Sequence, residues 1–279
     1  MNAEQVHAVI AAGLEEPELL QHWMQHPDQV RQFGVDPAEV DWRGLWLFAG
    51  LGTKVRHNPL RTALPLTFRV LKATALDIEI FSHYALQSAA LRHQGKNSFE
   101  DKVTSLYAFL ENWLDLSDNR HALLWDTIRH EVLLASLQNA SRDGHTEKKM
   151  SDLPPLGDAP QLSVNVVPTI NGTLTLREMS YDPDRVQALL MVGSSVLEQL
   201  EKELCYLGYW LPPSSDQVYL LRLDPFGFYL LQLVDDTRSV AGITRILDGQ
   251  GLDLPVEEVL NGLLSLADQH VITLVEKQV

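Results

Sequence analysis

The chain has 279 residues, of which 45% are apolar and 21% charged, a balance typical of folded proteins and not of disordered chains. It carries 22 basic and 37 acidic residues, and the formal charge of −15 argues against a general nucleic-acid binder, because such proteins neutralise phosphates with Lys and Arg. A single cysteine, Cys205, excludes an internal disulfide and a cysteine-rich metal site.

The sequence also lacks export and membrane signals. The amino terminus, MNAEQVHAVIAAG, has neither the basic region nor the long apolar core of a signal peptide. No stretch approaches the roughly 20 apolar residues needed to cross a bilayer. We therefore expect a cytoplasmic protein with no membrane partner.

The first half of the chain has the apolar spacing of helices. Ser98 and Asp101 form a capping-box pattern ahead of a further helix, with Leu106 and Leu110 on its apolar stripe. The other expected helices span residues 17–26, 27–34, 41–49, 75–92 and 119–139.

A polar segment with three prolines, near residues 141–160, separates this half from the next. We expect a helical domain over 1–145, a linker over 146–160 and a second domain over 161–279.

The second domain is expected to mix strands and helices. Two strand-like runs flank Asn171-Gly172, a tight-turn signal, and an apolar helix should run from Asp182-Pro183 to Cys205, a buried and inert thiol. The remaining expected elements are a strand over 217–223, helices over 225–234, 239–247 and 255–268, and a closing strand over 270–276. The fold class is therefore α+β, a helical domain followed by a winged helix-turn-helix.

Charge argues against DNA as the ligand of this winged helix. Residues 216–279 contain ten acidic and four basic side chains, and the third helix has no basic residue. Glu257 and Glu258 stand at its start, where a recognition helix would approach phosphates.

The same region resembles the PqqD-like recognition elements of RiPP (ribosomal peptide natural product) biosynthesis. The matching residues are Phe228 to Leu231, Val234 to Val240, Ile243, Val259 to Leu266 and Val271-Ile272, with Asp236 where the family commonly has glycine. The resemblance implies that a precursor's leader peptide adds as a strand beside residues 162–167 and 173–178, with the third helix as groove wall. The implied peptide-binding residues are Val164, Val166, Leu174, Leu176, Val259 and Leu263.

Residues 44–76 contain no acidic side chain, which is unusual in so acidic a chain. Gly50, Gly52, Pro59 and Pro65 indicate turns whose backbone amides would be free to bind ligands. The segment is either a solvated basic face or a contact for an acidic partner or substrate carboxylate. We favour the contact, and its candidate residues are Lys54, Arg56, His57, Asn58 and Arg61.

The chain as a whole is similar to the partner subunits of TIM-barrel multinuclear iron oxidases that modify cysteine in ribosomal peptides, in the pairs that make methanobactin and 3-thiaglutamate. The matching residues are Leu47-Phe48, Val55 to Asn58, Arg61, Leu64-Pro65, Thr67-Phe68, Arg129 to Glu131 and Tyr181-Asp182. The resemblance implies a heterodimer whose barrel holds the iron, with no cofactor and no catalytic residue in this chain. The 3-thiaglutamate pair fits the length and layout better.

Two rival functions remain open. One is a winged-helix transcription regulator with a helical sensor domain. The other is a stand-alone metalloenzyme, for which Glu79 and His83 have ligand spacing on one helix and His130-Glu131 could add to them. Helical Glu/His pairs at this spacing are usually surface partners, so we expect no metal site. We expect Arg129-His130-Glu131 to be a structural ion-pair cluster.

Overall fold

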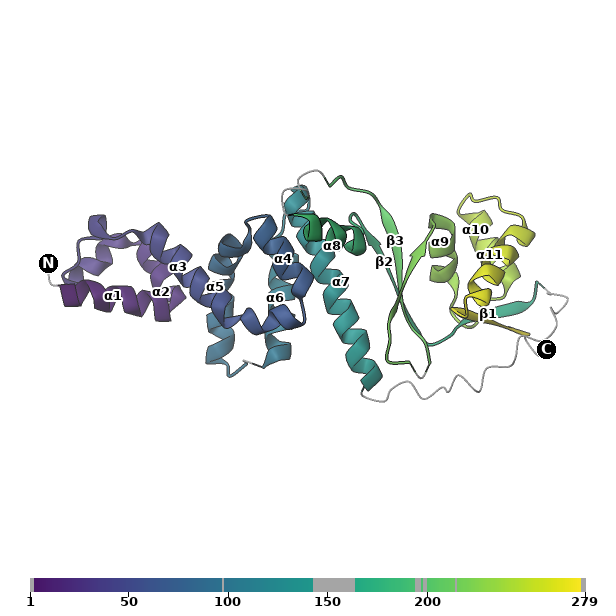
Figure 1. The fold of residues 1–279 in the computed structure, drawn as a ribbon, viewed down its shortest axis with the longest axis horizontal. Helices are drawn as coiled ribbons and strands as arrows, with labels where there is room; N and C mark the ends of the chain where they lie inside the picture. Colours follow the sequence, from purple (N-terminus) through teal and green to yellow (C-terminus); the bar gives the residue numbers. More distant parts are fainter. Residues whose placement is uncertain are drawn as a thin grey trace. The chain divides into compact units, whose positions relative to one another are not determined.

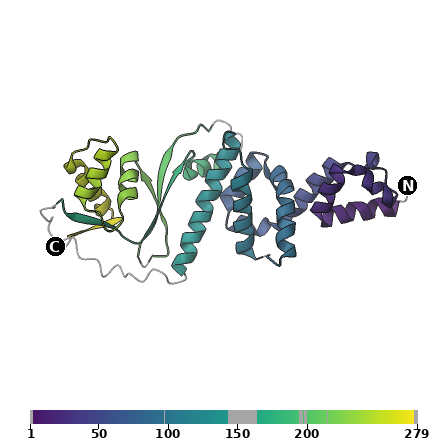
Figure 2. The same ribbon diagram turned by 180° about the vertical axis from the view of Figure 1, so that it is seen from behind.

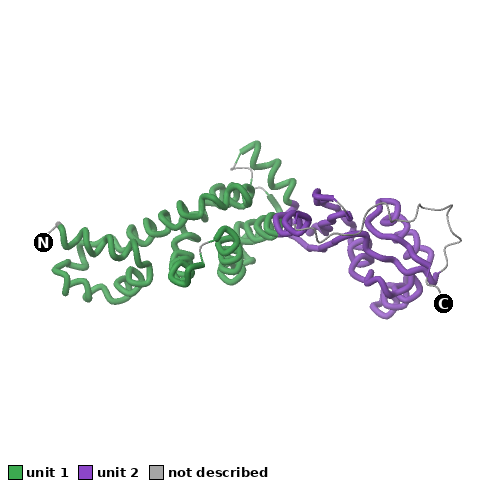
Figure 3. The backbone as a smooth tube through the Cα atoms, turned by 90° about the horizontal axis from the view of Figure 1, so that it is seen from below, with its two compact units in different colours: residues 1–132, 183–201 green, residues 133–182, 202–279 purple. Residues whose placement is uncertain are grey.

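A computed structural model describes residues 3–96, 98–142, 164–193, 197, 200–213 and 215–276. Its helices and small antiparallel sheets confirm the α+β class (Figure 1). The chain divides into two compact units, one of residues 1–132 and 183–201, the other of residues 133–182 and 202–279 (Figure 3). None of the described helices combines the length and apolar character that a membrane-spanning helix needs.

The first unit is helical. Its helices are α1 (Ala3–Glu15), α2 (Pro17–Gln25), α3 (Trp42–Arg56), α4 (Pro65–Ala73), α5 (Asp77–His93), α6 (Phe99–Trp113), the first part of α7 (Asn119–Arg142) and α8 (Pro183–Val192). Short 3-10 helices occupy Pro27–Phe33, Pro37–Glu39 and Asn58–Thr62. The expected capping box of α6 is confirmed, because Ser98 Oγ accepts the Asp101 N–H at 3.0 Å and Asp101 Oδ2 accepts the Ser98 N–H at 3.1 Å.

Helix α3 is longer than the predicted 41–49. Gly50 and Gly52 were expected in turns, and that prediction was wrong because both lie inside α3. A Cβ on Gly50 would come within 2.7 Å of the Ser82 Cα on α5, so the missing side chain permits a close approach of the two helices.

The expectation of free backbone amides near Pro65 was also wrong. Pro65 opens α4, and the carboxylate of Glu131 accepts the N–H groups of Leu66 and Thr67 at 2.7 Å each. Helix α4 thus begins on a buried carboxylate from α7, which satisfies donors that a helix start otherwise leaves open.

The described part of the second unit contains the end of α7, two antiparallel sheets and three further helices. Strand β1 (Val166–Ile170) pairs with β5 (Ile272–Glu276), and the other sheet has the order β2-β3-β4, formed by Thr173–Met179, Cys205–Leu211 and Tyr219–Leu223. The helices are α9 (Pro225–Leu233), α10 (Val240–Gly249) and α11 (Val256–Asp268), which lie together beside the β1–β5 ribbon (Figure 1, Figure 2).

Asn171-Gly172 does not form the expected tight hairpin turn. The strands on either side pair with different partners, β1 with β5 and β2 with β3. Gly172 has a φ of +95°, and a Cβ there would lie 2.3 Å from the Leu211 carbonyl oxygen. The turn signal was real, but it marks the point where the chain leaves one sheet for the other.

The apolar helix expected to run to Cys205 ends at Val192. Cys205 begins strand β3 instead, half-buried, with its Sγ 3.3 Å from the Met179 carbonyl oxygen. The prediction of a helix end was wrong because CYLGYWL forms the central strand between β2 and β4, and the periodicity of a short apolar run does not distinguish a buried strand from a helix segment.

Each of the two compact units is built from two segments of the chain. Leu137, near the end of α7, packs with Met179, Leu207 and Tyr209 in the second unit. Conversely, α8 belongs to the first unit, although it follows β2 in sequence. The expected linker over 146–160 lies outside the described residues, and the limits 1–145 and 161–279 stay a prediction.

Candidate functional site

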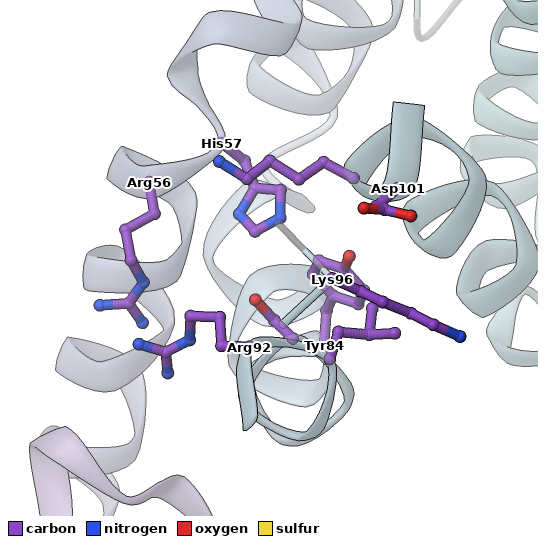
Figure 4. A pocket seen from close by; sticks show the side chains of 9 residues that line it. Arg56, His57, Tyr84, Arg92, Lys96 and Asp101 are labelled. Carbon is purple, nitrogen blue, oxygen red and sulfur yellow. The ribbon is translucent and has the colours of Figure 1, made fainter. Parts of the chain in front are cut away.

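A basic pocket of about 160 Å³ lies in the helical unit, among α3, α5 and α6. The aromatic rings of His57 and Tyr84 are among the groups that line it (Figure 4). Four cations and one acid also line it, namely Arg56, Arg92, Lys96, Lys102 and Asp101. Arg56 ends α3, Arg92 lies in the last turn of α5, and Lys102 lies in the first turns of α6.

The positive charge of this pocket is not neutralised by the residues that the structure describes. None of the ion pairs among them involves Arg56, Arg92, Lys96 or Lys102. The one acid of the pocket, Asp101, is engaged in the capping box of α6. The Arg92 Nε is buried, and none of the described residues accepts a hydrogen bond from it. Buried donors without an acceptor are rare, so Arg92 stands out among the cations of this pocket.

His57 is an uncharged, buried neighbour of these cations. Its ring is 2% exposed, and its Nδ1 donates to the Thr53 carbonyl oxygen at 2.8 Å. Burial lowers the pKa of His57, and the positive charges of Lys102, Arg56 and Arg92 lower it further, against the opposing effect of the carbonyl. The imidazole therefore adds no charge of its own at neutral pH.

Arg56 and Tyr84 are held in place by neighbouring hydroxyls. Arg56 Nη2 donates to Thr53 Oγ1 at 3.0 Å, and the Tyr84 hydroxyl donates to Ser105 Oγ at 3.0 Å. Burial and the nearby Arg92 lower the pKa of Arg56, although a guanidinium stays protonated. The pocket wall is thus organised before any ligand arrives.

The five residues predicted from the sequence separate in space. Arg56 and His57 line the pocket, whereas Lys54 forms an ion pair with Asp77. Arg61 lies over the Phe68 ring, with its Cζ 5.4 Å from the centroid, and Asn58 is exposed.

Arg92, Lys96 and Lys102 were not among the predicted site residues, although they line the same pocket as Arg56. Their only sequence signal is a cluster of cations between the end of one predicted helix and the start of the next. That this cluster faces α3 depends on how three helices pack.

An apolar face lies on α3, the helix whose last residue, Arg56, lines the pocket. Four large apolar side chains on this helix are exposed, by 39%, 58%, 40% and 56%, and they are Leu47, Phe48, Leu51 and Val55. Their spacing places them along one side of α3, and Val55 directly precedes Arg56. We call these four residues the α3 apolar face. Contiguous exposed apolar surface beside charged groups is typical of a docking site.

In the second unit, three of the predicted peptide-binding side chains belong to the core. Val166 is 3% exposed, and Val259 and Leu263 are fully buried. A peptide could not touch them without opening the core, so burial gives no support to direct contact by these three.

The other three predicted peptide-binding residues are more accessible. Leu174 and Leu176 of β2 are half-buried against the same core, and Val164 is 40% exposed. The outer edge of β1 is partly engaged, because the Val164 carbonyl accepts the Ala241 N–H at 2.9 Å and the Ile170 N–H donates to Asp236 at 3.1 Å. Within the described sheets, β2 and β4 are the edges of the three-stranded sheet.

The residues considered as metal ligands are engaged in aromatic packing, ion pairing and helix capping. Among the described residues, no group of three or more His, Cys, Asp or Glu side chains could hold a metal ion. His83 packs between the rings of Trp46 and Trp113, at 6.3 and 5.6 Å between centroids. In the Arg129-His130-Glu131 segment, Arg129 pairs with Asp126 at 3.4 Å and Glu131 caps α4.

Comparison with known proteins adds no family to these observations. No protein-family model matches the chain, and no curated protein matches it significantly. The function is therefore argued from the pocket, the α3 apolar face and the strand edges.

Proposed function

We propose that the chain is a non-catalytic partner subunit of a heterodimeric iron-dependent oxidase in RiPP biosynthesis. The helical unit docks on a TIM-barrel enzyme, which holds the iron and performs the oxidation. The second unit, as a PqqD-like winged helix, binds the leader of the precursor peptide. The product is a modified peptide cysteine, with a pathway of the 3-thiaglutamate type favoured.

The observation that carries the docking role is that one helix, α3, bears the exposed apolar face and ends at Arg56, a lining residue of the basic pocket. Exposed Phe48 and Val55 provide apolar area that becomes stabilising when a partner covers it. The adjacent cations provide charge complementarity to an acidic partner surface, which selects the partner and orients it. In a chain of charge −15, a basic pocket of this kind is suited to a defined contact with an acidic partner.

The peptide-binding role is supported by the order of elements in the second unit. Strands β3 and β4, three helices and the closing β5 follow one another as in a winged helix. Strand β2, which contains the predicted edge residues 173–178, is an edge of the three-stranded sheet, where an added strand obtains backbone hydrogen bonds. Helix α11, the counterpart of a DNA-recognition helix, begins with exposed Glu257 and Glu258, which favours a peptide over DNA.

Co-purification with candidate barrel enzymes tests the docking role. We expect Phe48→Glu to reduce heterodimer affinity at least about tenfold, because it places a charge in the centre of the apolar face. The matched control is Leu116→Glu, which changes a side chain that is 49% exposed in the loop after α6. Equal affinities of the two variants would contradict docking through α3.

Leader-peptide binding is tested on the chain alone and on its complex with the barrel enzyme. A fluorescently labelled leader is expected to bind the chain with or without the barrel enzyme, as measured by polarisation. Sequence-specific binding of DNA in a gel shift at physiological salt, with no leader binding, would instead favour a transcription regulator.

A further inference from the structure

We infer that the basic pocket is a binding site for a side-chain carboxylate, supplied by an acidic residue of the protein that covers the α3 apolar face. This inference rests on the proposed docking role and goes beyond it by naming the chemical group that enters the pocket. It is based on the placement of Arg56, Arg92 and Lys102 around one pocket and on the Arg92 Nε, which has no acceptor among the described residues.

The first ground is the convergence of like charges. Arg56 and Arg92 point their guanidinium groups towards the same space beside His57 (Figure 4). Lys102 of α6 lines the same pocket, and its positive charge lowers the pKa of His57. Lys96, by contrast, runs away from His57 in Figure 4. Arg56, Arg92 and Lys102 repel one another across the pocket, where Asp101 is the one acid among the lining residues, and a bound anion would attract all three.

The second ground is the unsatisfied donor. The Arg92 Nε is buried and lacks a partner among the described residues, although its neighbours are satisfied. Tyr84 donates to Ser105, and the His57 Nδ1 donates to Thr53. The free donors are therefore those of guanidinium and ammonium groups, which bind carboxylates through strong, charge-assisted hydrogen bonds.

Size and surroundings favour a side-chain carboxylate over a polyanion. A volume of about 160 Å³ accommodates a group of a few heavy atoms. Val55, the last residue of the α3 apolar face, directly precedes Arg56 in the chain, so a segment that covers this face would carry apolar side chains beside its acidic one. The chain's charge of −15 repels nucleic acid.

The test uses the full-length chain with ¹⁵N-labelled arginine, and it follows the Arg Nε–H resonances by NMR. The probe is N-acetylglutamate α-amide, which carries only a side-chain carboxylate. N-acetylglutamine amide is the neutral analogue, inorganic phosphate is the competing anion, and sodium chloride matches the ionic strength. We expect a saturable shift of the Arg92 Nε–H resonance with the carboxylate and not with the neutral analogue or chloride.

Charge-removing variants locate the site. Arg56→Gln and Lys102→Gln should each weaken carboxylate binding about tenfold, since each removes a charge-assisted contact. The matched control is Lys72→Gln, which removes an exposed cation of α4 and should leave the affinity unchanged. Thermal unfolding of each variant confirms that the fold is retained.

The outcomes separate this inference from the docking role. Equal shifts with chloride, equal weakening by Lys72→Gln, or binding of phosphate without carboxylate would overturn the carboxylate site. Full heterodimer affinity in Arg56→Gln and Lys102→Gln, with Phe48→Glu disruptive, would overturn the entry of a partner carboxylate and leave docking intact. Saturable carboxylate binding with no barrel enzyme co-purifying would support the site and reject the proposed function.

Discussion

His57 shows how a residue chosen for its chemistry can serve as a scaffold. Its Nδ1 bonds to the carbonyl of Thr53, one turn back, and its ring packs against Phe81 and Tyr84 at 5.7 and 5.1 Å between centroids. Burial comes first among the causes that lower its pKa, and three neighbouring cations add to it. Protonation of His57 would therefore place a fourth charge in an apolar site beside the existing ones.

Stability should consequently depend on pH through His57. Because its pKa is lower in the folded than in the unfolded chain, the unfolded state takes up the proton first, near the ordinary value of about 6.5. The free energy of unfolding should be unaffected by this group above that pH and should fall as the pH drops below it. Each unit by which the pKa is lowered corresponds to about 1.4 kcal/mol.

Denaturant unfolding between pH 8 and pH 5 measures this effect, with His57→Phe as the comparison because Phe keeps a ring against Phe81 and Tyr84. The stability of the natural chain relative to the variant should decrease towards pH 5. Parallel pH profiles of the two proteins would show that His57 does not carry the effect, and a ring-proton titration locates its pKa directly.

At the scale of an element, α3 packs closely against α5 on one side and exposes the α3 apolar face on another. Gly50 faces α5, where a Cβ would come within 2.7 Å of backbone atoms of Ser82. Gly52 lies on the open side, and the nearest atom to a Cβ there is the Arg56 Nη1 at 3.6 Å. The two glycines, two residues apart on one helix, therefore have opposite surroundings.

Alanine at these two positions should have opposite effects on stability. Gly50→Ala is expected to destabilise the chain by about 1–3 kcal/mol, because α3 and α5 must separate to admit the methyl group. Gly52→Ala is expected to stabilise it by up to about 1 kcal/mol, since alanine is the better helix former and its methyl group meets only an ordinary contact. Thermal and denaturant unfolding measure both changes. Similar effects of the two substitutions would contradict the packing of α3 on α5.

At the scale of the whole molecule, the two compact units exchange segments. The end of α7 contributes Leu137 to a core formed with Met179, Leu207 and Tyr209, which come later in the chain. Helix α8 follows β2 in sequence and belongs to the helical unit. The chain therefore passes between the units three times, and each unit is built from both sides of residues 146–160.

Cleavage within residues 146–160 should for this reason leave one particle. A specific protease site inserted there separates the chain into two fragments, each carrying part of the other's unit. We expect the cut protein to elute from a sizing column with the uncut protein. Adding Leu137→Asp, which places a charge in the shared core, should promote dissociation. Separate elution of the cut fragments without this substitution would favour two independent domains with the limits 1–145 and 161–279.

Local patterns predicted much of the secondary structure, because the signals involved act within a few residues. The capping box at Ser98 marks a helix found in the structure, and the helices predicted to start at residues 17, 225 and 239 begin at Pro17, Pro225 and Val240. The α+β class and the acid-free segment with Arg56 and His57 were visible in the same way.

What the sequence by itself determined is thus the helix starts, the α+β composition and the concentration of basic residues in an acidic chain. Only the tertiary structure decided which strands pair across Asn171-Gly172, that Cys205 begins a strand, and that Gly50 lies within a helix. It also decided the pocket, because Arg92 and Lys102 reach Arg56 only when α5 and α6 pack beside α3. These features depend on contacts between residues far apart in the chain, which neither spacing nor composition records. The net charge of −15 says only that the chain is acidic, whereas the packing of three helices concentrates positive charge at one place.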